Sequence, residues 1–195
     1  MNRIICLIGA AGLVWTLSLT GDPAKAWEAG PCDFITGGGF IVRDSGAKAN
    51  FGNAGGCKHG SPTWGHLNYI DHGTGLHVRS HEITGYFFVD SFGPDPKTGQ
   101  PRGSRIVCGR AQTNQYGDVD FAMLKIDKGE PGVDDEFRLR LTQGGVTVYT
   151  TEFDSNYTLG GSGPGGGNEQ LHKPNPSTSG DFGGKCDAYP EIEAS

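Results

Sequence analysis

Five acidic side chains gather around one short turn between residues 127 and 137. They are Asp127, Glu130, Asp134, Asp135 and Glu136. Calcium binds six to eight oxygen atoms at about 2.3–2.6 Å and prefers carboxylates and backbone carbonyls on flexible loops. If the turn folds back on itself, four of these carboxylates converge. The candidate calcium ligands are Asp127, Glu130, Asp134 and Asp135.

The same segment also fits a plain β-hairpin. Strand-like sequence flanks it at residues 121–126 and 137–141. Pro131-Gly132 suits a tight turn, and Asp127 would then cap that turn while the other acids stay solvated. The spacing is not that of an EF-hand, which needs alternating ligands before its glycine. The sequence leaves both interpretations open.

Most of the histidines fall in one region. They are His59, His66, His72, His77 and His81, with only His172 outside it. His77 and His81 lie four residues apart on one expected strand, roughly 13 Å, which is too far to share a metal ion. His66 and His72, with Asp71 beside them, form a candidate set of two histidines and one carboxylate for zinc or copper. The alternative is that both histidines fix a turn by hydrogen bonds to the backbone.

Other chemistry has little support in the sequence. A serine nucleophile needs Gly-x-Ser-x-Gly between a strand and a helix, and the glycine-rich stretches here precede no helix. Several aromatic residues are candidates for a sugar-stacking platform, although rings of this kind more often lie in a sheet core. They are Trp64, Tyr69, Tyr86, Tyr116, Tyr149 and Tyr157.

The N-terminal residues have the pattern of a secretory signal. Arg3 is followed by an apolar run from Ile4 to Leu19 and by Ala24-Lys25-Ala26 at the expected cleavage site. We predict a signal peptide over residues 1–26, which places the mature protein outside the cell, in the periplasm or at the cell surface. Its removal changes the net charge from −6 to −7. So acidic a chain without a basic stripe argues against nucleic-acid binding, and no later segment could span a bilayer.

Four cysteines remain after cleavage: Cys32, Cys57, Cys108 and Cys186. An even number in an exported chain predicts two disulfides, and three connectivities are possible. We favour Cys32–Cys186, joining the ends, with Cys57–Cys108 inside. Free buried thiols are the alternative. Zinc is less favoured because no Cys-x-x-Cys spacing occurs.

Between its 34 glycines the chain has strand-length apolar segments and no long helical periodicity. Phe137, Leu139 and Leu141 alternate with charged residues, which indicates a strand with one buried face. The expected strands cover residues 34–42, 76–81, 84–89, 106–111, 119–126, 137–141 and 146–149. Loops are expected at residues 53–62, 92–102 and 174–184. We predict a single all-β, disulfide-bonded domain over residues 27–173, an antiparallel β-sandwich of jelly-roll-like or related barrel type. Residues 174–195 form a Pro/Ser/Gly-rich tail, tied back through Cys186.

Five short motifs together resemble a known family. They are Gly37-Gly38-Gly39-Phe40-Ile41, Asn50-Phe51-Gly52, Gly65-His66-Leu67-Asn68-Tyr69-Ile70-Asp71-His72, Asp127-x-Gly129-Glu130-Pro131-Gly132-x-x-Asp135-x-Phe137 and Gly167-Asn168-x-Gln170-Leu171-His172-Lys173. In these residues the chain resembles the post-COAP type of secreted bacterial β-rich domains over about residues 34–173. The resemblance implies export and a β fold, with no established catalytic activity. The closing motif departs from the compact family form through a glycine-rich insertion before Asn168.

The functional prediction is a secreted, non-catalytic β-sandwich domain that acts as a structural or binding module, stabilised by calcium. Its partner would be a cell-surface protein or a glycan. Two alternatives belong to other classes: a small secreted metal-dependent enzyme that uses His66, Asp71 and His72, and a carbohydrate-binding module.

Overall fold

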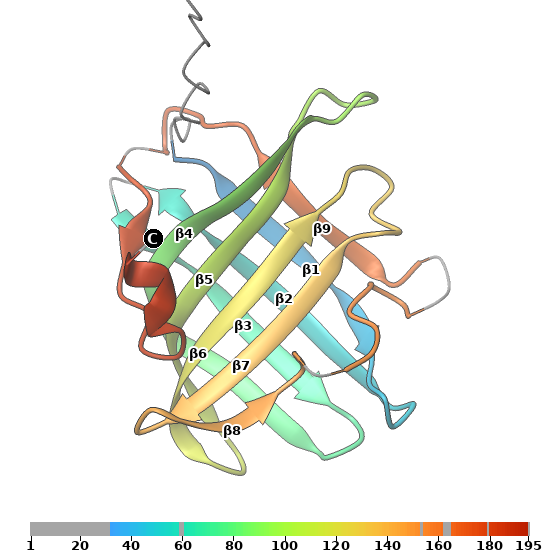
Figure 1. Cartoon of the computed structure of the whole chain (residues 1–195), viewed down its shortest axis with the longest axis vertical. Coiled ribbons are helices and arrows are strands. Elements are labelled where there is room, and N and C mark those ends of the chain that lie inside the picture. Colours follow the sequence, from blue (N-terminus) through green and yellow to red (C-terminus); the bar gives the residue numbers. More distant parts are fainter. Residues whose placement is uncertain (1–31, 59–60, 153, 162–164, 179, 195) are drawn as a thin grey trace, which may run out of the picture.

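The computed structural model of the chain describes residues 32–58, 61–152, 154–161, 165–178 and 180–194 (Figure 1). The predicted signal peptide, residues 1–26, lies outside the described residues. Within these ranges, no helix is long and apolar enough to cross a membrane.

Antiparallel strands make up most of the described chain. They are β1 (Phe34–Val42), β2 (Lys48–Lys58), β3 (Ser61–Asp71), β4 (Leu76–Pro94), β5 (Pro101–Thr113), β6 (Gly117–Asp127), β7 (Glu136–Gln143), β8 (Val146–Thr150), β9 (Gly167–His172) and β10 (Gly183–Gly184), followed by a 3₁₀ turn at Pro190–Ala194. All belong to one sheet with the order β8-β7-β6-β5-β4-β3-β2-β1-β9, and β10 pairs with β4. Most neighbouring strands are therefore consecutive hairpins.

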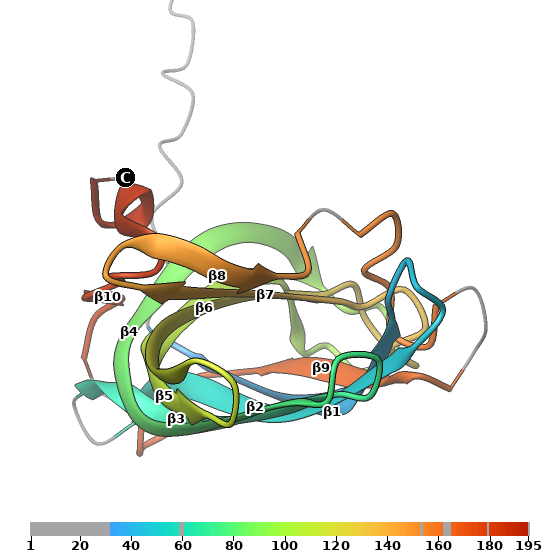
Figure 2. The same cartoon turned by 90° about the horizontal axis from the view of Figure 1, so that it is seen from below.

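The single sheet curls into a half-barrel. Figure 2 shows β4 bending round so that β6 and β7 lie above β1, β2 and β9. The pairing of β4 with β5 shifts register at four places along the strand, and such bulges bend a strand and increase its twist. The prediction of an all-β, antiparallel fold is confirmed. The two-sheet sandwich is not confirmed, because the strands form one continuous sheet.

The core fills the space that the curled sheet encloses. Phe51 of β2 stacks on Phe137 of β7, with ring centroids 4.0 Å apart, so the two flanks of the sheet touch through aromatic side chains. Phe137, Leu139 and Leu141 are fully buried, which confirms the alternation predicted for this strand.

All three predicted loops contain strand residues. Residues 53–58 and 61–62 belong to β2 and β3, part of 92–102 extends β4 and β5 into a long hairpin, and 174–184 ends in β10. β2 was missed because its glycines hide the strand pattern. At Gly55 a Cβ atom would come within 2.5 Å of the Val107 side chain, so glycine lets β5 pack against β2.

Two disulfides join Cys32 to Cys57 and Cys108 to Cys186. The favoured pairing of Cys32 with Cys186 and Cys57 with Cys108 is therefore wrong. Strand register decides the connectivity: Gly56 lies opposite Phe34 in the β1–β2 ladder, which places Cys57 beside Cys32. Cys108 lies opposite Gly85 of β4, which also pairs with Gly184 just before Cys186. The C-terminal segment is thus attached to β4 and β5.

Candidate ligand-binding pocket

The acidic turn places two of its carboxylates in the interior. Asp127 is 4% exposed and Asp135 is fully buried, whereas Asp134 is exposed to solvent. Asp127 accepts hydrogen bonds from the backbone N–H groups of Gly129 (2.8 Å) and Leu171 (2.7 Å). Asp135 accepts from those of Lys128 and Glu169, both at 2.8 Å. Both carboxylates therefore bind backbone donors.

These contacts cap the free edge of β9. One edge of β9 pairs with β1, and on the opposite edge Glu169 and Leu171 donate to the two carboxylates. Glu130 adds a side-chain contact, because its Oε1 accepts from Asn168 Nδ2 at 3.1 Å. An uncovered edge strand exposes backbone groups that can pair with another chain. The turn substitutes for a neighbouring strand.

Calcium binding by the turn stays a prediction. Among the described residues, no group of three or more His, Cys, Asp or Glu side chains is arranged to hold a metal ion. Of the four candidate ligands, Asp127 and Asp135 lie side by side against β9, Glu130 contacts Asn168, and Asp134 lies in solvent.

A buried ion pair lies beside these carboxylates. Lys125 Nζ is 3.0 Å from Glu169 Oε2, and both side chains are fully excluded from solvent. Asn53 Nδ2 donates to the other Glu169 oxygen at 2.7 Å. Desolvation raises the pKa of Glu169 and lowers that of Lys125. Desolvation also raises the pKa of Asp127, and it raises the pKa of Asp135 to about 7.

The structure does not bring His66, Asp71 and His72 together. His66 is exposed on the outer face of β3, opposite Ala54, while Asp71 is buried five residues further along the same strand. That separation is roughly 16 Å at strand rise. His72 is exposed, and its Nε2 forms a 2.8 Å hydrogen bond with Asn50 Oδ1.

Asp71 has a structural environment of its own. Its Oδ2 accepts from Arg43 Nη1 at 2.8 Å and from the Tyr149 hydroxyl at 2.9 Å, and its Oδ1 accepts from the Gly73 backbone at 2.8 Å. Hydrogen bonds from the Tyr149 hydroxyl and from backbone N–H groups outweigh desolvation, so the pKa of Asp71 is lowered. The carboxylate joins the β3–β4 turn to β8.

The six aromatic candidates do not form one platform. Tyr69 and Tyr86 are fully buried in the core, and Tyr116 and Tyr149 pack against it. The Arg138 guanidinium lies 3.8 Å from the centroid of the Tyr157 ring. Trp64 lies on the outer face, where Lys58 Nζ is 4.1 Å from the centroid of its ring.

One apolar pocket of about 300 Å³ lies between the β4–β5 hairpin and the segments that follow β9. Five of its eleven lining residues are phenylalanines or prolines, and two cations and one carboxylate also line it. The lining residues are Asp33, Phe88, Ser91, Gly93, Pro94, Gly99, Pro101, Arg105, Lys173, Pro174 and Phe182. A wider hollow of about 460 Å³ near Asn68 and Arg79 has more polar walls. Small-molecule sites are mostly apolar with a few placed polar groups, so the smaller pocket is the better candidate.

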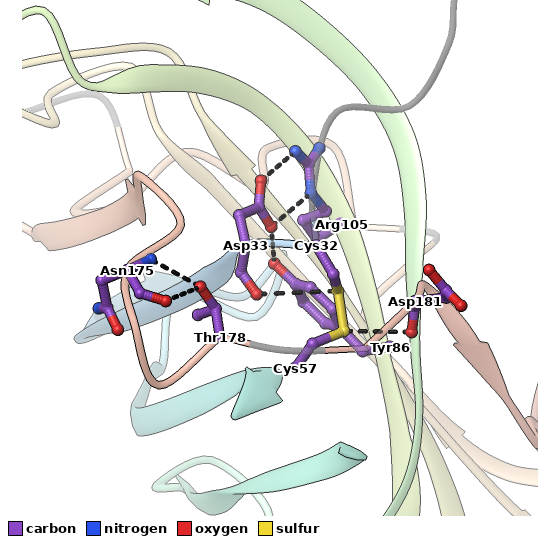
Figure 3. The surroundings of a disulfide bond; sticks show 8 residues. All are labelled: Cys32, Asp33, Cys57, Tyr86, Arg105, Asn175, Thr178 and Asp181. Atoms are coloured by element: carbon purple, nitrogen blue, oxygen red, sulfur yellow. Dashed lines mark hydrogen bonds and ion pairs between the residues drawn. A yellow bond between two sulfur atoms is a disulfide. The ribbon is translucent and has the colours of Figure 1, made fainter. Parts of the chain in front are cut away.

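A buried ion pair is part of the pocket wall (Figure 3). Arg105 donates from Nη2 to Asp33 Oδ2 at 2.5 Å and from Nε to Oδ1 at 3.1 Å, and the Tyr86 hydroxyl donates to the same Oδ1 at 2.6 Å. Asp33 and Arg105 are each 4% exposed. Asp33 directly follows Cys32, so the Cys32–Cys57 disulfide holds it in place. The guanidinium also lies 4.5 Å from the Phe88 ring and 5.3 Å from the Phe182 ring.

Sequence reasoning missed this pocket. Its walls come from Asp33 just before β1, from the β4–β5 hairpin, and from two separate stretches after β9. The prolines of residues 92–102 had indicated only a loop. No local pattern could have joined these segments, because the curl of the sheet and the Cys108–Cys186 disulfide bring them together.

Comparisons with protein-family models, curated proteins and solved structures found no match for this chain.

Proposed function

We propose that this protein is an exported, non-catalytic binding domain whose ligand occupies the pocket between the β4–β5 hairpin and the C-terminal segment. The observation that carries the proposal is the pocket itself, with its phenyl and proline walls around a buried Asp33–Arg105 pair. A pocket of this composition is the usual form of a small-molecule site.

Two features support a pocket that is formed before the ligand arrives. The Cys108–Cys186 disulfide attaches the segment after Phe182 to β5, and β10 pairs with β4. On the other wall, Arg105 donates to the carbonyls of Asp90 and Ser104 at 2.9 and 2.8 Å. A preformed site loses less conformational freedom on binding, which favours affinity.

Export is the second part of the proposal. The predicted signal over residues 1–26, the two disulfides and the resemblance to post-COAP domains support it. Expression of the full chain in a bacterial host should release a protein that begins at Trp27, as read by N-terminal sequencing. An uncleaved product retained in the cytoplasm would contradict export.

Calcium stabilisation is retained as a separate prediction for the acidic turn. If Asp127, Glu130, Asp134 and Asp135 bind the ion, millimolar calcium should raise the melting temperature and a chelator should abolish the gain. Identical melting curves would remove calcium from the proposal and leave the pocket unaffected.

The proposal that the pocket binds a ligand is tested with small compounds and with a variant that blocks the pocket. We expect members of a library of small ring-containing compounds to raise the melting temperature of the wild type and to shift NMR signals of pocket residues. Ser91→Trp places an indole at a lining position and should abolish both effects. The matched control is Ser45→Trp, at an exposed serine in the β1–β2 turn. Absence of any binder to the wild type, or equal binding to Ser91→Trp, would overturn the proposal.

A further inference from the structure

We infer that the pocket takes a small organic acid, a molecule with one ring or a short hydrocarbon body and a single carboxylate. This inference rests on the proposed function and names the ligand class for the same site. Three properties of the pocket lead to it: its volume, the composition of its walls and the sign of its charge.

The volume and the walls set the body of the ligand. The pocket volume of about 300 Å³ is at the lower end of the range for small-molecule sites. A ligand with a single ring fits this volume better than a peptide does. Phe88 and Phe182 meet edge to face with centroids 5.7 Å apart, and Pro94, Pro101 and Pro174 complete the apolar surface. Burial of hydrocarbon against these walls is favourable in proportion to its area.

The charged residues of the pocket determine the charge of the ligand's polar group. Arg105 and Lys173 line the pocket with one carboxylate, Asp33, so the lining carries a net charge of +1 when all three are ionised. Both oxygens of Asp33 already accept hydrogen bonds from Arg105, and one also accepts from Tyr86. The negative charge of Asp33 is therefore balanced by Arg105, and the remaining positive charge in the lining is that of Lys173. An anion gains from this field and a cation is repelled.

Hydrogen-bond donors remain for a carboxylate. A guanidinium has five N–H groups, and four of those on Arg105 reach Asp33, Asp90 and Ser104. The fifth, on Nη2, has no acceptor among the described residues. Lys173 is exposed, and within the described part of the chain its ammonium forms no ion pair. A carboxylate that contacts either group forms a charge-assisted hydrogen bond, the stronger kind.

Three probes with the same phenyl ring and a chain of similar length test the inference: 4-phenylbutanoate, its primary amide and 4-phenylbutylamine. Their dissociation constants for the mature wild-type protein are measured by NMR titration and calorimetry. We expect the acid to bind roughly tenfold more tightly than the amide, the size of one charge-assisted hydrogen bond, and the amine to bind most weakly.

Variants of Lys173 test whether this lysine supplies the positive charge that binds the carboxylate. Lys173→Met should raise the dissociation constant of the acid roughly tenfold and leave that of the amide unchanged. Lys173→Arg should retain most of the affinity for the acid. Lys97→Met is the matched control, because Lys97 is exposed on the β4–β5 hairpin and does not line the pocket. It should leave all three dissociation constants unchanged.

Equal affinity for acid and amide in the wild type would overturn the inference while leaving the proposed binding function in place. An acid preference that survives Lys173→Met would overturn the role given to Lys173. Failure of all three probes would overturn the inference, and together with a negative compound screen it would overturn the proposed function as well.

Discussion

Lys125 and Glu169 lie in contact inside the half-barrel, and neither side chain reaches solvent. Moving two charges from water into the interior costs several kcal/mol for each ion, and their mutual attraction repays this only when the geometry is good. Asn53 supplies a further hydrogen bond to Glu169. Replacing one partner should therefore lower the free energy of unfolding more than replacing both.

Lys125→Met should lower the free energy of unfolding by about 3–5 kcal/mol, because it leaves Glu169 buried and unpaired. Lys125→Met with Glu169→Gln should recover most of that loss, since the amide oxygen can still accept from Asn53. Urea denaturation of the wild type, the single variant and the double variant measures the coupling. A double variant no more stable than the single one would contradict this account.

Asp135 makes stability depend on pH. Burial first, and then the neighbouring charges of Asp127 and Glu169, raise its pKa from 3.8 to about 7, although two backbone N–H groups oppose the shift. A raised pKa means that the folded state keeps a proton that the unfolded state releases. The resulting stability is fully present below pH 4 and is lost as the pH rises through 7.

We expect the free energy of unfolding of the wild type to fall between pH 4 and pH 7, by at most about 1.4 kcal/mol per pH unit from this group. Asp135→Asn should be less stable at all pH values, because one amide oxygen cannot accept from both backbone donors. Its deficit relative to the wild type should shrink as the pH rises through 7. A deficit that is constant from pH 4 to pH 8 would show that Asp135 titrates normally.

At the scale of elements, the acidic turn between β6 and β7 holds β9 by accepting hydrogen bonds from its backbone. Residues of a strand point their backbone N–H groups alternately to its two sides, so Glu169 and Leu171 face the carboxylates while Gln170 faces β1. The outer edge of β9 therefore depends on two side chains.

Asp127→Ala should expose the Leu171 amide. We expect its hydrogen exchange to accelerate roughly 10- to 100-fold, the effect of losing one hydrogen bond to a charged group, with little change at Gln170. Asp134→Ala, an exposed acid of the same turn, should leave both amides protected. Equal acceleration at Leu171 and Gln170 would indicate that the whole strand has loosened.

Some elements were predictable from local pattern and others were not. β7 was predictable because Phe137, Leu139 and Leu141 alternate without interruption. β2 was not, because Gly52, Gly55 and Gly56 remove the side chains that would show the alternation. The acidic turn was found from its composition. Its role as an edge cap was not, since that role depends on a strand more than thirty residues later in the chain, as the Asp135–Glu169 contact shows.

At the scale of the molecule, the two disulfides close loops of different size. Cys32 and Cys57 are 25 residues apart, whereas Cys108 and Cys186 are 78 apart. Their presence could be predicted from the count of cysteines. Their connectivity could not, because it follows from which strands become neighbours. The pocket was unpredictable for the same reason.

Replacing Cys108 and Cys186 by alanine should lower the free energy of unfolding more than replacing Cys32 and Cys57. Loop-closure entropy gives about 4.5 kcal/mol for the longer loop and about 3.5 kcal/mol for the shorter one. Denaturant titration of both double variants measures the order. The opposite ranking would show that contacts around Cys32, such as the Asp33–Arg105 pair, matter more than chain entropy.

The pairing of β1 with β9 has a consequence for the folding pathway. From β1 to β8 each strand pairs with the next in sequence, so those ladders need only short loops, whereas Phe34 pairs with His172. Closing so long a loop is entropically expensive, and we expect the β1–β9 ladder to form after the rate-limiting step. Stopped-flow kinetics of Asp127→Ala should then show faster unfolding with an almost unchanged folding rate. The carboxylates of the turn would thus govern how long the folded protein lasts, with little influence on how quickly it forms.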